Sequence, residues 1–421
     1  MKVLVAQIGS RRHYVIPQYF YRAGILAEFV TDFLSDHGWM QLVRGFSPVL
    51  KFLPRYRKLL GRHVPGVPRS LTYAFNAFGL KRTISSGFSN APDAVRARHL
   101  RDNKRFGELV SSRGFADADA VYCFNGAAVE VFQAAKEKGI RCILDQTSAP
   151  VEYEENLMGQ VYSEYPAWES SAGEIGMSDA WRAMAEREKQ EWDLADQIIT
   201  GSDHVRTALD SVGADVTRVT VVPYGTHYAE EDRPVPIRQR HDRPLRVLYV
   251  GNLRLLKGIQ YLYNAANEFP KDEVDFRAVG PNRLSCPTLK MIASRIRVVG
   301  PVPRSELREH YEWADVLVVP SVSEGSANVA YEALSTRLPV IASSNAGTIV
   351  EDGSTGFIVP PRSSDAIVQA IQRFLDTPEM LSKLSTATAA LKEQLTLQSY
   401  ESRLVAALRA SCQGTTHGTC R

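Results

Sequence analysis

Residues 315–361 constrain the fold more than any other stretch of this chain, because they spell out a strand, a loop, a helix and a second strand in order. Val316–Val319 is apolar at every position, as a strand buried on both faces of a parallel sheet must be. A second apolar run occupies 338–342. This order predicts a βαβ unit, and parallel sheets of this kind bind ligands at the loops that follow their strands. The loop after Val319 is therefore a candidate binding site.

Two carboxylates mark this candidate site. Glu324 lies in the loop at the start of the expected helix, and Glu332 follows eight residues later. Backbone N–H groups at a helix N-terminus favour anions, and here they belong to Ser326, Ala327 and Asn328. Asn328 lies one turn before Glu332 and shares its helical face. The pattern predicts a site that combines acidic side chains with an anion-binding backbone.

The length of the chain favours two domains. At 421 residues it exceeds what one hydrophobic core usually organises. We expect a first α/β domain at 1–226, a linker rich in proline and charge at 227–245, and a second α/β domain at 246–396. A helix and tail at 397–421 are expected to pack back on the first domain. Two such domains would enclose a cleft between their strand edges.

The first domain opens with a buried-type strand at 3–8 that runs into Gly9, followed by an expected helix over 16–34. This is a Rossmann-like beginning with a single glycine. Gly9 permits a ligand to approach the backbone closely. His13, in the loop after the strand, is either a substrate contact or an ordinary surface histidine.

A later strand at 141–144 ends at Asp145 and Gln146, and we expect both side chains to face the cleft as ligand contacts. The Asp-Ala-Asp sequence at 117–119 imitates a metal-binding D-x-D motif. It precedes an apolar strand and so lies at the edge of the sheet away from the cleft. A surface turn is the favoured interpretation, and no metal site is predicted.

Basic residues concentrate in an insertion expected at about 40–105. Residues 44–105 hold 14 Lys and Arg against two acidic residues, although the whole chain carries a net charge of only +3. One interpretation is a solvated charged face. The second, which we favour, is peripheral docking on an anionic membrane surface. Nucleic acid is a third possibility, but no recognised binding module is present, and we expect no nucleic-acid partner.

Five scattered cysteines lack metal-ligand spacing, so reduced thiols are the simplest interpretation. The first residues, MKVLVAQIGSRR, contain too short an apolar run for a signal peptide and no cleavage site. No apolar stretch reaches the length of a membrane span. These features predict a cytoplasmic protein, with the inner face of the membrane as a possible place of association.

Five motifs follow one another in the second half of the chain: VGNLRLLKG at 250–258, RVVGPVPRSELREHYEWADVLVVPS at 297–321, EGSANVAYE at 324–332, PVIAS at 339–343 and EDGSTGFIVP at 351–360. In this order they resemble the retaining, nucleotide-sugar-dependent glycosyltransferases of the GT-B fold, family four (glycosyl transferases group 1), whose E-x7-E motif the third one fits. The resemblance implies two Rossmann-like domains that face each other across a cleft. The helix carrying Glu332 ends in TRLP at 336–339 where the family usually has C-G-x-P, so we expect an altered turn there.

The loop that ends at Gly258 supplies the positive charge that a diphosphate requires. Lys257 stands at a helix start, where backbone N–H groups already favour phosphate; the alternative is a solvated surface lysine. The family often has arginine directly after Gly251, but this chain has Asn252 there. Arg254, two residues on, is the candidate to take over that charge. We expect Gly251, Asn252 and Arg254 to bind the donor and Lys257 to be catalytic.

Glu332 is expected to hold the ribose of the donor, because one carboxylate can accept from two vicinal hydroxyls; a helix-surface glutamate is the alternative. The resemblance places Glu324 in the active site facing the transferred sugar, so we expect it to be catalytic. Its alternative is a charge satisfied by the helix dipole. The remaining expected contacts are Ser326, Ala327 and Asn328 for the donor, and Gly9, His13, Asp145 and Gln146 for the sugar or acceptor.

The resemblance implies a hexosyltransferase that moves a hexose from a nucleotide diphosphate sugar to a glycan or lipid-linked acceptor. In retaining enzymes of this fold the leaving phosphate can take the acceptor's proton, so the protein has to stabilise charge on the diphosphate. No cofactor or metal is expected. A GT-B-fold epimerase or hydrolase is one alternative, although the nine histidines show no acid/base cluster. A non-catalytic nucleotide-sugar-binding protein is the other, and the intact Lys257, Glu324 and Glu332 argue against it.

Overall fold

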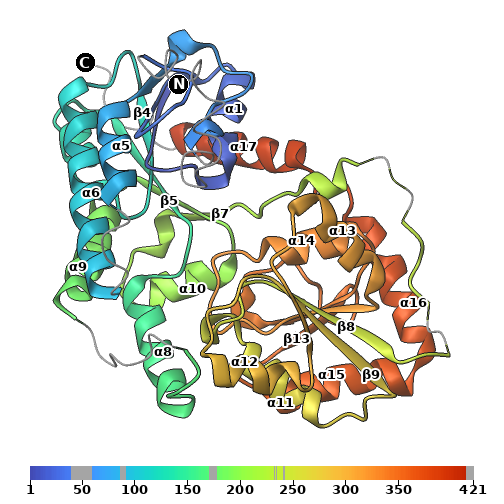
Figure 1. Cartoon of the computed structure of the whole chain (residues 1–421). Coiled ribbons are helices and arrows are strands. Elements are labelled where there is room, and N and C mark those ends of the chain that lie inside the picture. Colours follow the sequence, from blue (N-terminus) through green and yellow to red (C-terminus); the bar gives the residue numbers. More distant parts are fainter. Residues whose placement is uncertain are drawn as a thin grey trace.

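The computed structural model describes residues 1–38, 59–85, 92–169, 178–231, 233, 235–239 and 242–413. Within these residues the chain forms two parallel sheets, one of seven strands and one of six. Figure 1 shows the sheets in two separate halves of the molecule, each sheet flanked by helices. The predicted pair of facing Rossmann-like halves is confirmed.

The N-terminal sheet has the strand order β3-β2-β1-β4-β5-β6-β7. Its strands β1 and β4 are buried at every position, as expected for the centre of a parallel sheet covered on both faces. The strands are β1 Val3–Gln7, β2 Leu26–Thr31, β3 Thr72–Ala74, β4 Ala120–Phe124, β5 Arg141–Gln146, β6 Gln197–Thr200 and β7 Val219–Val221. The helices of this part are α1 Val15–Arg22, α5 Asn76–Ser85, α6 Pro92–Arg113, α7 Val129–Lys136, α8 Val151–Glu164, α9 Asp179–Leu194 and α10 Asp203–Ser211.

The C-terminal sheet has the order β10-β9-β8-β11-β12-β13. Its strands are β8 Leu245–Val250, β9 Val274–Val279, β10 Arg297–Gly300, β11 Val316–Val319, β12 Val340–Ser343 and β13 Gly356–Val359. The helices are α11 Ile259–Asn267, α12 Cys286–Ala293, α13 Arg304–Trp313, α14 Asn328–Ser335, α15 Ser364–Asp376, α16 Pro378–Ala387 and α17 Leu397–Gln413. The predicted strand, loop, helix and strand order of residues 315–361 is present as β11, α14 and β12.

Each sheet reverses its direction of growth at one point, between β1 and β4 in the first and between β8 and β11 in the second. At such a point the loops that leave two neighbouring strands diverge and open a crevice. The loops after β8 and β11 therefore lie side by side, although about 70 residues separate them in the sequence. This topology positions the candidate site.

The helix expected over 16–34 is wrong. α1 ends at Arg22, a turn through Gly24 with φ of 71° follows, and the chain continues as β2. Strand β2 pairs in parallel with β1, with Phe29 opposite Val5. The apolar residues of 25–30 fitted a helical pattern as well as a strand pattern, and burial beside β1 decides for the strand. Helix α8 was also not foreseen, because its residues read as a polar loop.

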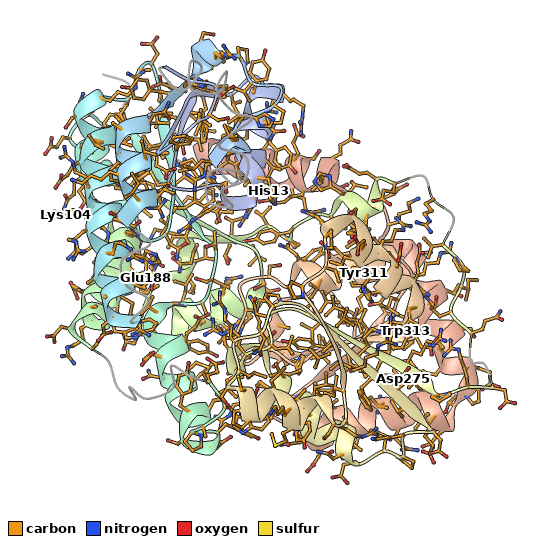
Figure 2. The ribbon with its side chains drawn as sticks, in the orientation of Figure 1. His13, Lys104, Glu188, Asp275, Tyr311 and Trp313 are labelled. Atoms are coloured by element: carbon orange, nitrogen blue, oxygen red, sulfur yellow. The ribbon has the colours of Figure 1, made fainter. Side chains whose placement is uncertain are left out.

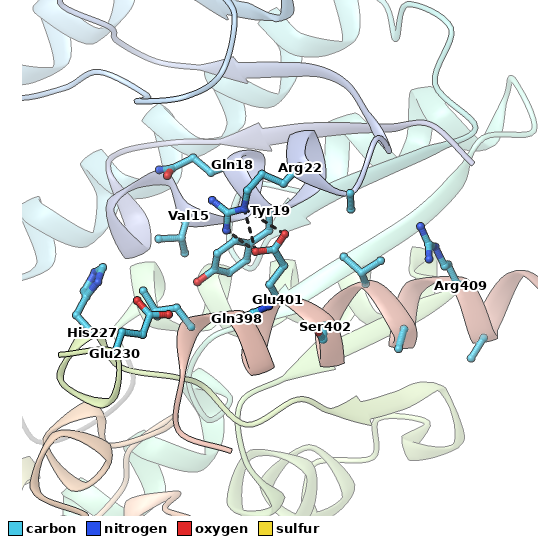
Figure 3. A pocket seen from close by; sticks show the side chains of 15 residues that line it. Val15, Gln18, Tyr19, Arg22, His227, Glu230, Gln398, Glu401, Ser402 and Arg409 are labelled. Carbon is cyan, nitrogen blue, oxygen red and sulfur yellow. Dashed lines mark hydrogen bonds and ion pairs between the residues drawn. The ribbon is translucent and has the colours of Figure 1, made fainter. Parts of the chain in front are cut away.

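Helix α8 belongs to the N-terminal part of the sequence but packs on the C-terminal half. Met158 and Val161 are buried in the hydrophobic core that surrounds the C-terminal sheet. In the other direction, α17 returns to lie against α1, where Arg22 forms an ion pair with Glu401 (Figure 3). Each half thus contributes one helix to the other. The domain boundaries predicted at 226/227 and 245/246 stay a prediction.

Part of the basic segment, residues 39–58 and 86–91, lies outside the described residues. In the described part, Arg62 and Arg82 both form ion pairs with the buried carboxylate of Asp32, at 3.1 and 2.9 Å. These two arginines therefore contribute to the structure of the N-terminal half. No helix that the structure describes combines the length and apolar character needed to cross a membrane.

Candidate functional site

A close contact between two loops creates the site in the C-terminal half. We name residues 251–258, after β8, the Lys257 loop, and residues 320–327, after β11, the Glu324 loop. Gly258 adopts a left-handed conformation with φ of 74°, and a Cβ at this position would lie 1.9 Å from the carbonyl oxygen of Pro320. Only glycine permits this approach. The contact brings Lys257 beside the Glu324 loop.

Lys257 and Glu324 form an ion pair, with 2.6 Å between Nζ and Oε1. Ser321 Oγ donates to the other oxygen, Oε2, at 2.9 Å, so both carboxylate oxygens of Glu324 are engaged. The two side chains of the pair are only 23% and 20% exposed, which limits screening of the pair by water. The sequence-predicted catalytic residues are therefore in direct contact at the crevice.

Glu332 lies farther along α14 in a mostly buried position. Tyr311, on α13, donates its hydroxyl to Glu332 Oε2 at 2.7 Å, and Arg304 lies 3.5 Å from Oε1. Burial raises the pKa of Glu332, while Tyr311 and Arg304 oppose that effect. Because Tyr311 fixes one oxygen, the second is the oxygen available to a further donor. Figure 2 shows Tyr311 in the C-terminal half.

A carboxylate not foreseen from the sequence lies on the Lys257 loop. Glu169 Oε1 accepts from the backbone N–H of Leu255 at 2.5 Å and lies 4.0 Å from Nε of Arg254. The side chain of Glu169 is 4% exposed. The backbone N–H of Leu255 and the guanidinium of Arg254 together suit an anion, and the carboxylate of Glu169 occupies this position. Asn252 is exposed, and its carbonyl accepts from Tyr249.

A second carboxylate, Glu154 of α8, contacts the Glu324 loop. Its Oε1 accepts from Ser323 Oγ at 3.2 Å, and the Nε2 atom of His204 lies 3.2 Å from the same hydroxyl. Burial raises the pKa of Glu154 to about 7, and burial lowers the pKa of His204 to about 4. Ser323 thus joins two elements of the N-terminal half to the loop that carries Glu324.

The halves also touch through backbone. Ser202 Oγ donates to the carbonyl of Gly325 at 2.6 Å. A Cβ on Gly325 would lie 1.9 Å from the carbonyl oxygen of Thr147, the first residue of the loop after β5. The Glu324 loop is therefore pressed against the N-terminal half at a residue without a side chain.

A cavity of about 130 Å³ lies between the two halves. His13 lines it from the N-terminal half, and Arg304, Asn328 and Glu332 line it from the C-terminal half. Figure 2 shows His13 near the space that separates the halves. The structure thus brings His13, Asn328 and Glu332, all predicted from the sequence, to one cavity.

A larger groove of about 1150 Å³ runs between α1 and α17 (Figure 3). It shares Val15, Tyr19, His227 and Leu397 with the small cavity. The groove therefore lies directly beside the cavity that Glu332 lines.

The other N-terminal candidates have internal partners. Asp145 is fully buried, where it accepts from Tyr122 at 2.6 Å and forms an ion pair with Arg12 at 3.1 Å. Gln146 is also buried and donates to Glu188 at 3.2 Å. These contacts support the loops around the cavity but give no support to a direct role of Asp145 or Gln146 with substrate, which stays a prediction.

Gly9 has a φ of 78°, and its N–H donates to Asp32 Oδ1 at 2.8 Å. In the Glu324 loop, the N–H of Ala327 donates to the carbonyl of Ala346 at 3.1 Å, so this group is not free for an anion. Ser326 Oγ pairs with the hydroxyl of Tyr331 at 3.0 Å. Of the predicted N–H groups, that of Ala327 is thus already used within the protein.

The altered turn after α14 keeps a left-handed residue without the usual glycine. Arg337 stands at the glycine position of C-G-x-P with φ of 56°. Such a conformation costs an L residue about 1–2 kcal/mol. Ser385 donates its hydroxyl to the carbonyl of Arg337 at 2.8 Å and helps to hold the turn. The turn thus has arginine in place of the family's usual glycine and still has a left-handed residue at that position.

Neither Glu154 nor Glu169 carried a signal in the sequence, because both reach the site through the packing of a distant segment. Arg304 and Tyr311 lie within the motif at 297–321, seven residues apart on α13, but nothing in that motif indicates a partner on α14. Among the residues that the structure describes, no three His, Cys, Asp or Glu side chains are grouped to hold a metal ion.

Comparison with known proteins agrees with this geometry. Residues 244–377, which contain both site loops, match the family described as Glycosyl transferases group 1. The structure is similar to that of a sucrose-phosphate synthase from Thermosynechococcus elongatus, with a TM-score of 0.66, 17% identity, and coverage of 99% of this chain and 100% of the other. At this identity the likeness shows the fold alone.

Two curated relatives resemble the chain over part of its length. An alpha-D-kanosaminyltransferase of Streptomyces kanamyceticus is 30% identical over 173 residues, which cover 38% of this chain and 45% of the relative. A D-inositol 3-phosphate glycosyltransferase of Geodermatophilus obscurus is 30% identical over 262 residues, or 56% of this chain and 57% of the relative. The matches thus span about half of the length of each relative.

We expect Gly325→Ala to hold the two halves apart. The added methyl group would collide with the backbone of Thr147, which cannot move aside as a flexible side chain can. Small-angle X-ray scattering should give a larger radius of gyration for this variant than for the natural protein. Gly159→Ala is the matched control, because nothing lies within 4 Å of its new methyl group. Equal radii for both variants would contradict the contact.

We expect Glu154→Gln to flatten the pH dependence of stability. Burial raises the pKa of Glu154 to about 7 from its usual value of 4.5, so between these values the folded protein binds more protons than the unfolded chain. The free energy of unfolding therefore falls as pH rises through this window. Lys257, Arg254 and Glu188 are the charged groups that face it.

Chemical denaturation between pH 5 and pH 8 measures this effect. Relative to the natural protein, Glu154→Gln should gain roughly 1–3 kcal/mol of stability across the window, since one pKa unit corresponds to about 1.4 kcal/mol. Glu186→Gln is the control, because Glu186 is exposed, and it should show no such gain in stability. A constant difference between Glu154→Gln and the natural protein at all pH values would show that this carboxyl group is not perturbed.

Proposed function

We propose that this chain, whose residues 244–377 match the glycosyl transferases group 1 family, is a retaining hexosyltransferase that uses a nucleotide diphosphate sugar. The observation that carries the proposal is the contact of Lys257 with Glu324 at the switch point of the C-terminal sheet. A transferase of this kind needs a cation for the diphosphate and a polar group for the sugar at one place. The two loops supply both.

The donor would lie across the C-terminal half. Lys257 and Arg254 would hold the diphosphate, because both are cations on the Lys257 loop: Arg254 precedes the short helix Leu255–Lys257, and Lys257 lies two residues before α11. Glu332 would accept from the ribose hydroxyls with the carboxylate oxygen that Tyr311 leaves available. Glu324 would contact the transferred hexose from the loop between them.

The chemistry proposed is a transfer on one face of the sugar. The bond between the anomeric carbon and the leaving phosphate oxygen breaks, and a bond from that carbon to the acceptor oxygen forms. The acceptor's proton passes to the leaving phosphate, so no protein base is required. Lys257 stabilises the negative charge that grows on the diphosphate, an interaction that strengthens in the transition state. Because this cation is part of the chain, we expect activity to persist in the presence of a chelator.

The acceptor would approach from the N-terminal half. The cavity lined by His13 and Glu332 lies beside the groove between α1 and α17, which would give a glycan or a lipid-linked molecule room to extend away from the site. His13 is exposed and lines the cavity from the N-terminal half. The relatives' names identify an aminosugar transfer and an inositol phosphate acceptor for those proteins, and the donor and acceptor of this chain are to be found by assay.

A panel of nucleotide sugars, each with and without candidate acceptors, tests the proposal. Release of free nucleotide only when acceptor is present supports transfer. Lys257→Ala should lower kcat about 100-fold or more, as removal of a group that stabilises the transition state does. Glu324→Gln should also lower kcat strongly, because it removes the ionic partner of Lys257. Lys271→Ala and Glu268→Gln, both exposed in the same half, are the matched controls and should keep full activity.

Three outcomes would contradict the proposal. Nucleotide release that does not depend on acceptor would identify a hydrolase or an epimerase. Tight nucleotide-sugar binding without turnover would identify a binding protein. Undiminished activity in Lys257→Ala and Glu324→Gln would place the chemistry elsewhere.

We also propose that the basic segment 44–105 holds the protein against an anionic membrane surface, where lipid-linked acceptors would be found. Its excess of Lys and Arg supports this, since each such residue near the surface adds about 1 kcal/mol of attraction. In a flotation assay the protein should rise with anionic phospholipid vesicles at low salt and stay behind with neutral ones. High salt should release it. Absence of binding to anionic vesicles at low salt would contradict the proposal.

A further inference from the structure

The turn that joins β1 to α1 has an unusual backbone. Arg12, His13 and Tyr14 are consecutive residues with positive φ angles of 47°, 51° and 63°. L residues other than glycine adopt this left-handed region only at an energetic cost, and rarely in succession. Such a conformation persists only where the surrounding structure holds it, and it concentrates at functional sites. The contacts of the turn therefore show what holds it.

The residues around His13 are anchored. Arg11 donates to the side chain of Asn125 at 3.1 Å, and Tyr14 is buried against Phe29 with 5.5 Å between ring centres. His13 is the exposed member of the turn. The anchors thus fix the backbone on both sides of a side chain that is free to meet a ligand.

Arg12 makes the most extensive of these contacts. Its guanidinium forms an ion pair with the buried Asp145 of β5 at 3.1 Å and donates to the hydroxyls of Tyr224 and Tyr400. Its central carbon lies 3.9 Å from the ring centre of Tyr224. Tyr224 follows β7 at the crossing between the halves, and Tyr400 is on α17. A planar guanidinium can serve a carboxylate, two hydroxyls and an aromatic face at once, which a lysine ammonium cannot.

The same contacts lead to the cavity between the halves. Tyr224 stacks on Tyr331, with 6.4 Å between ring centres and 30° between planes, and Tyr331 is the neighbour of Glu332 on α14. His13 lines the cavity opposite Glu332. Arg12 therefore connects the position of His13 to the segment after β7 and, through Tyr224 and Tyr331, to the helix that carries Glu332.

We propose that Arg12 is a positioning residue for the transfer reaction. It holds the left-handed turn through Asp145, Tyr224 and Tyr400, and by doing so it presents His13 to the acceptor in the cavity. This inference rests on the proposed function for its kinetic consequence, but its structural part stands without it.

A double-mutant cycle between Arg12→Lys and His13→Ala tests the role. The donor and acceptor are the pair that the nucleotide-sugar panel identifies. Arg12→Lys keeps the charge for Asp145 but loses the fork and the stacking. It should lower kcat for transfer at least about tenfold while the donor KM changes less than about twofold, because Lys257 and Glu332 are untouched. In the His13→Ala background, Arg12→Lys should have little further effect.

The cycle has two contrary outcomes. An equally large effect of Arg12→Lys in the His13→Ala background and in the natural protein would show that Arg12 acts independently of His13. A rise in the donor KM that exceeds the fall in kcat would assign Arg12 to donor binding. Tyr400→Phe, which keeps the ion pair with Asp145, should give a smaller change in kcat of the same kind as Arg12→Lys.

Amide hydrogen exchange separates this inference from the proposed function, since it requires no substrate. Exchange in a peptide that spans residues 10–15 should be at least about tenfold faster in Arg12→Lys than in the natural protein. Arg22→Lys is the matched control, because Arg22 also joins α1 to α17, through Glu401, but does not contact the turn. Unchanged exchange at residues 10–15 in Arg12→Lys would overturn the inference, whatever reaction the protein catalyses.

Discussion

The ion pair between Lys257 and Glu324 depends on a glycine at position 258. Any side chain there would meet the carbonyl of Pro320 and push the Lys257 loop away from the Glu324 loop. The left-handed φ of Gly258 adds a second reason for glycine, because it starts α11 in a conformation that other residues rarely adopt. The strand order places the two loops at the same crevice, since β8 and β11 are neighbours and their loops leave on either side of it.

Protein carboxylates compensate each cation of this crevice. Glu324 lies on Lys257, and Glu169 lies beside Arg254 and on the N–H of Leu255. A partly buried cation without a partner is costly, so these carboxylates hold the site in shape before a ligand arrives. A diphosphate that accepts a hydrogen bond from the N–H of Leu255 must displace Glu169. A diphosphate that binds Lys257 alone can do so while Lys257 keeps its ion pair with Glu324. The segment that carries Glu169 also carries α8, so a donor that displaced Glu169 would also act on the contact between the halves.

The sequence predicted those parts of the site that are local in the chain. Lys257, Glu324 and Glu332 follow apolar strands at fixed spacings, and strand burial made their loops recognisable. The prediction of secondary structure from the sequence failed where a helical and a strand pattern both fit, as in β2, whose apolar residues also suit a helix. It also failed for Glu154 and Glu169, because α8 crosses to the other half and no spacing in the sequence records that packing.

The N-terminal candidates show the same limit from the other side. Asp145 was expected to face the cleft because it ends a strand, and it does end β5. Its carboxylate is nevertheless taken by Tyr122 and Arg12. A strand end specifies where a residue lies but not which partner its side chain finds. The strained turn that carries His13 could not be foreseen either, because its left-handed residues are not glycines.

The most direct test of this account is a crystal structure of the protein with a nucleoside diphosphate bound. The account predicts the terminal phosphate within hydrogen-bond distance of Lys257 Nζ and a ribose hydroxyl on the carboxylate of Glu332. It also predicts that the space next to this phosphate, where the hexose would lie, is bordered by Glu324. A nucleotide bound away from the loops after β8 and β11, with the pair of Lys257 and Glu324 undisturbed, would contradict it.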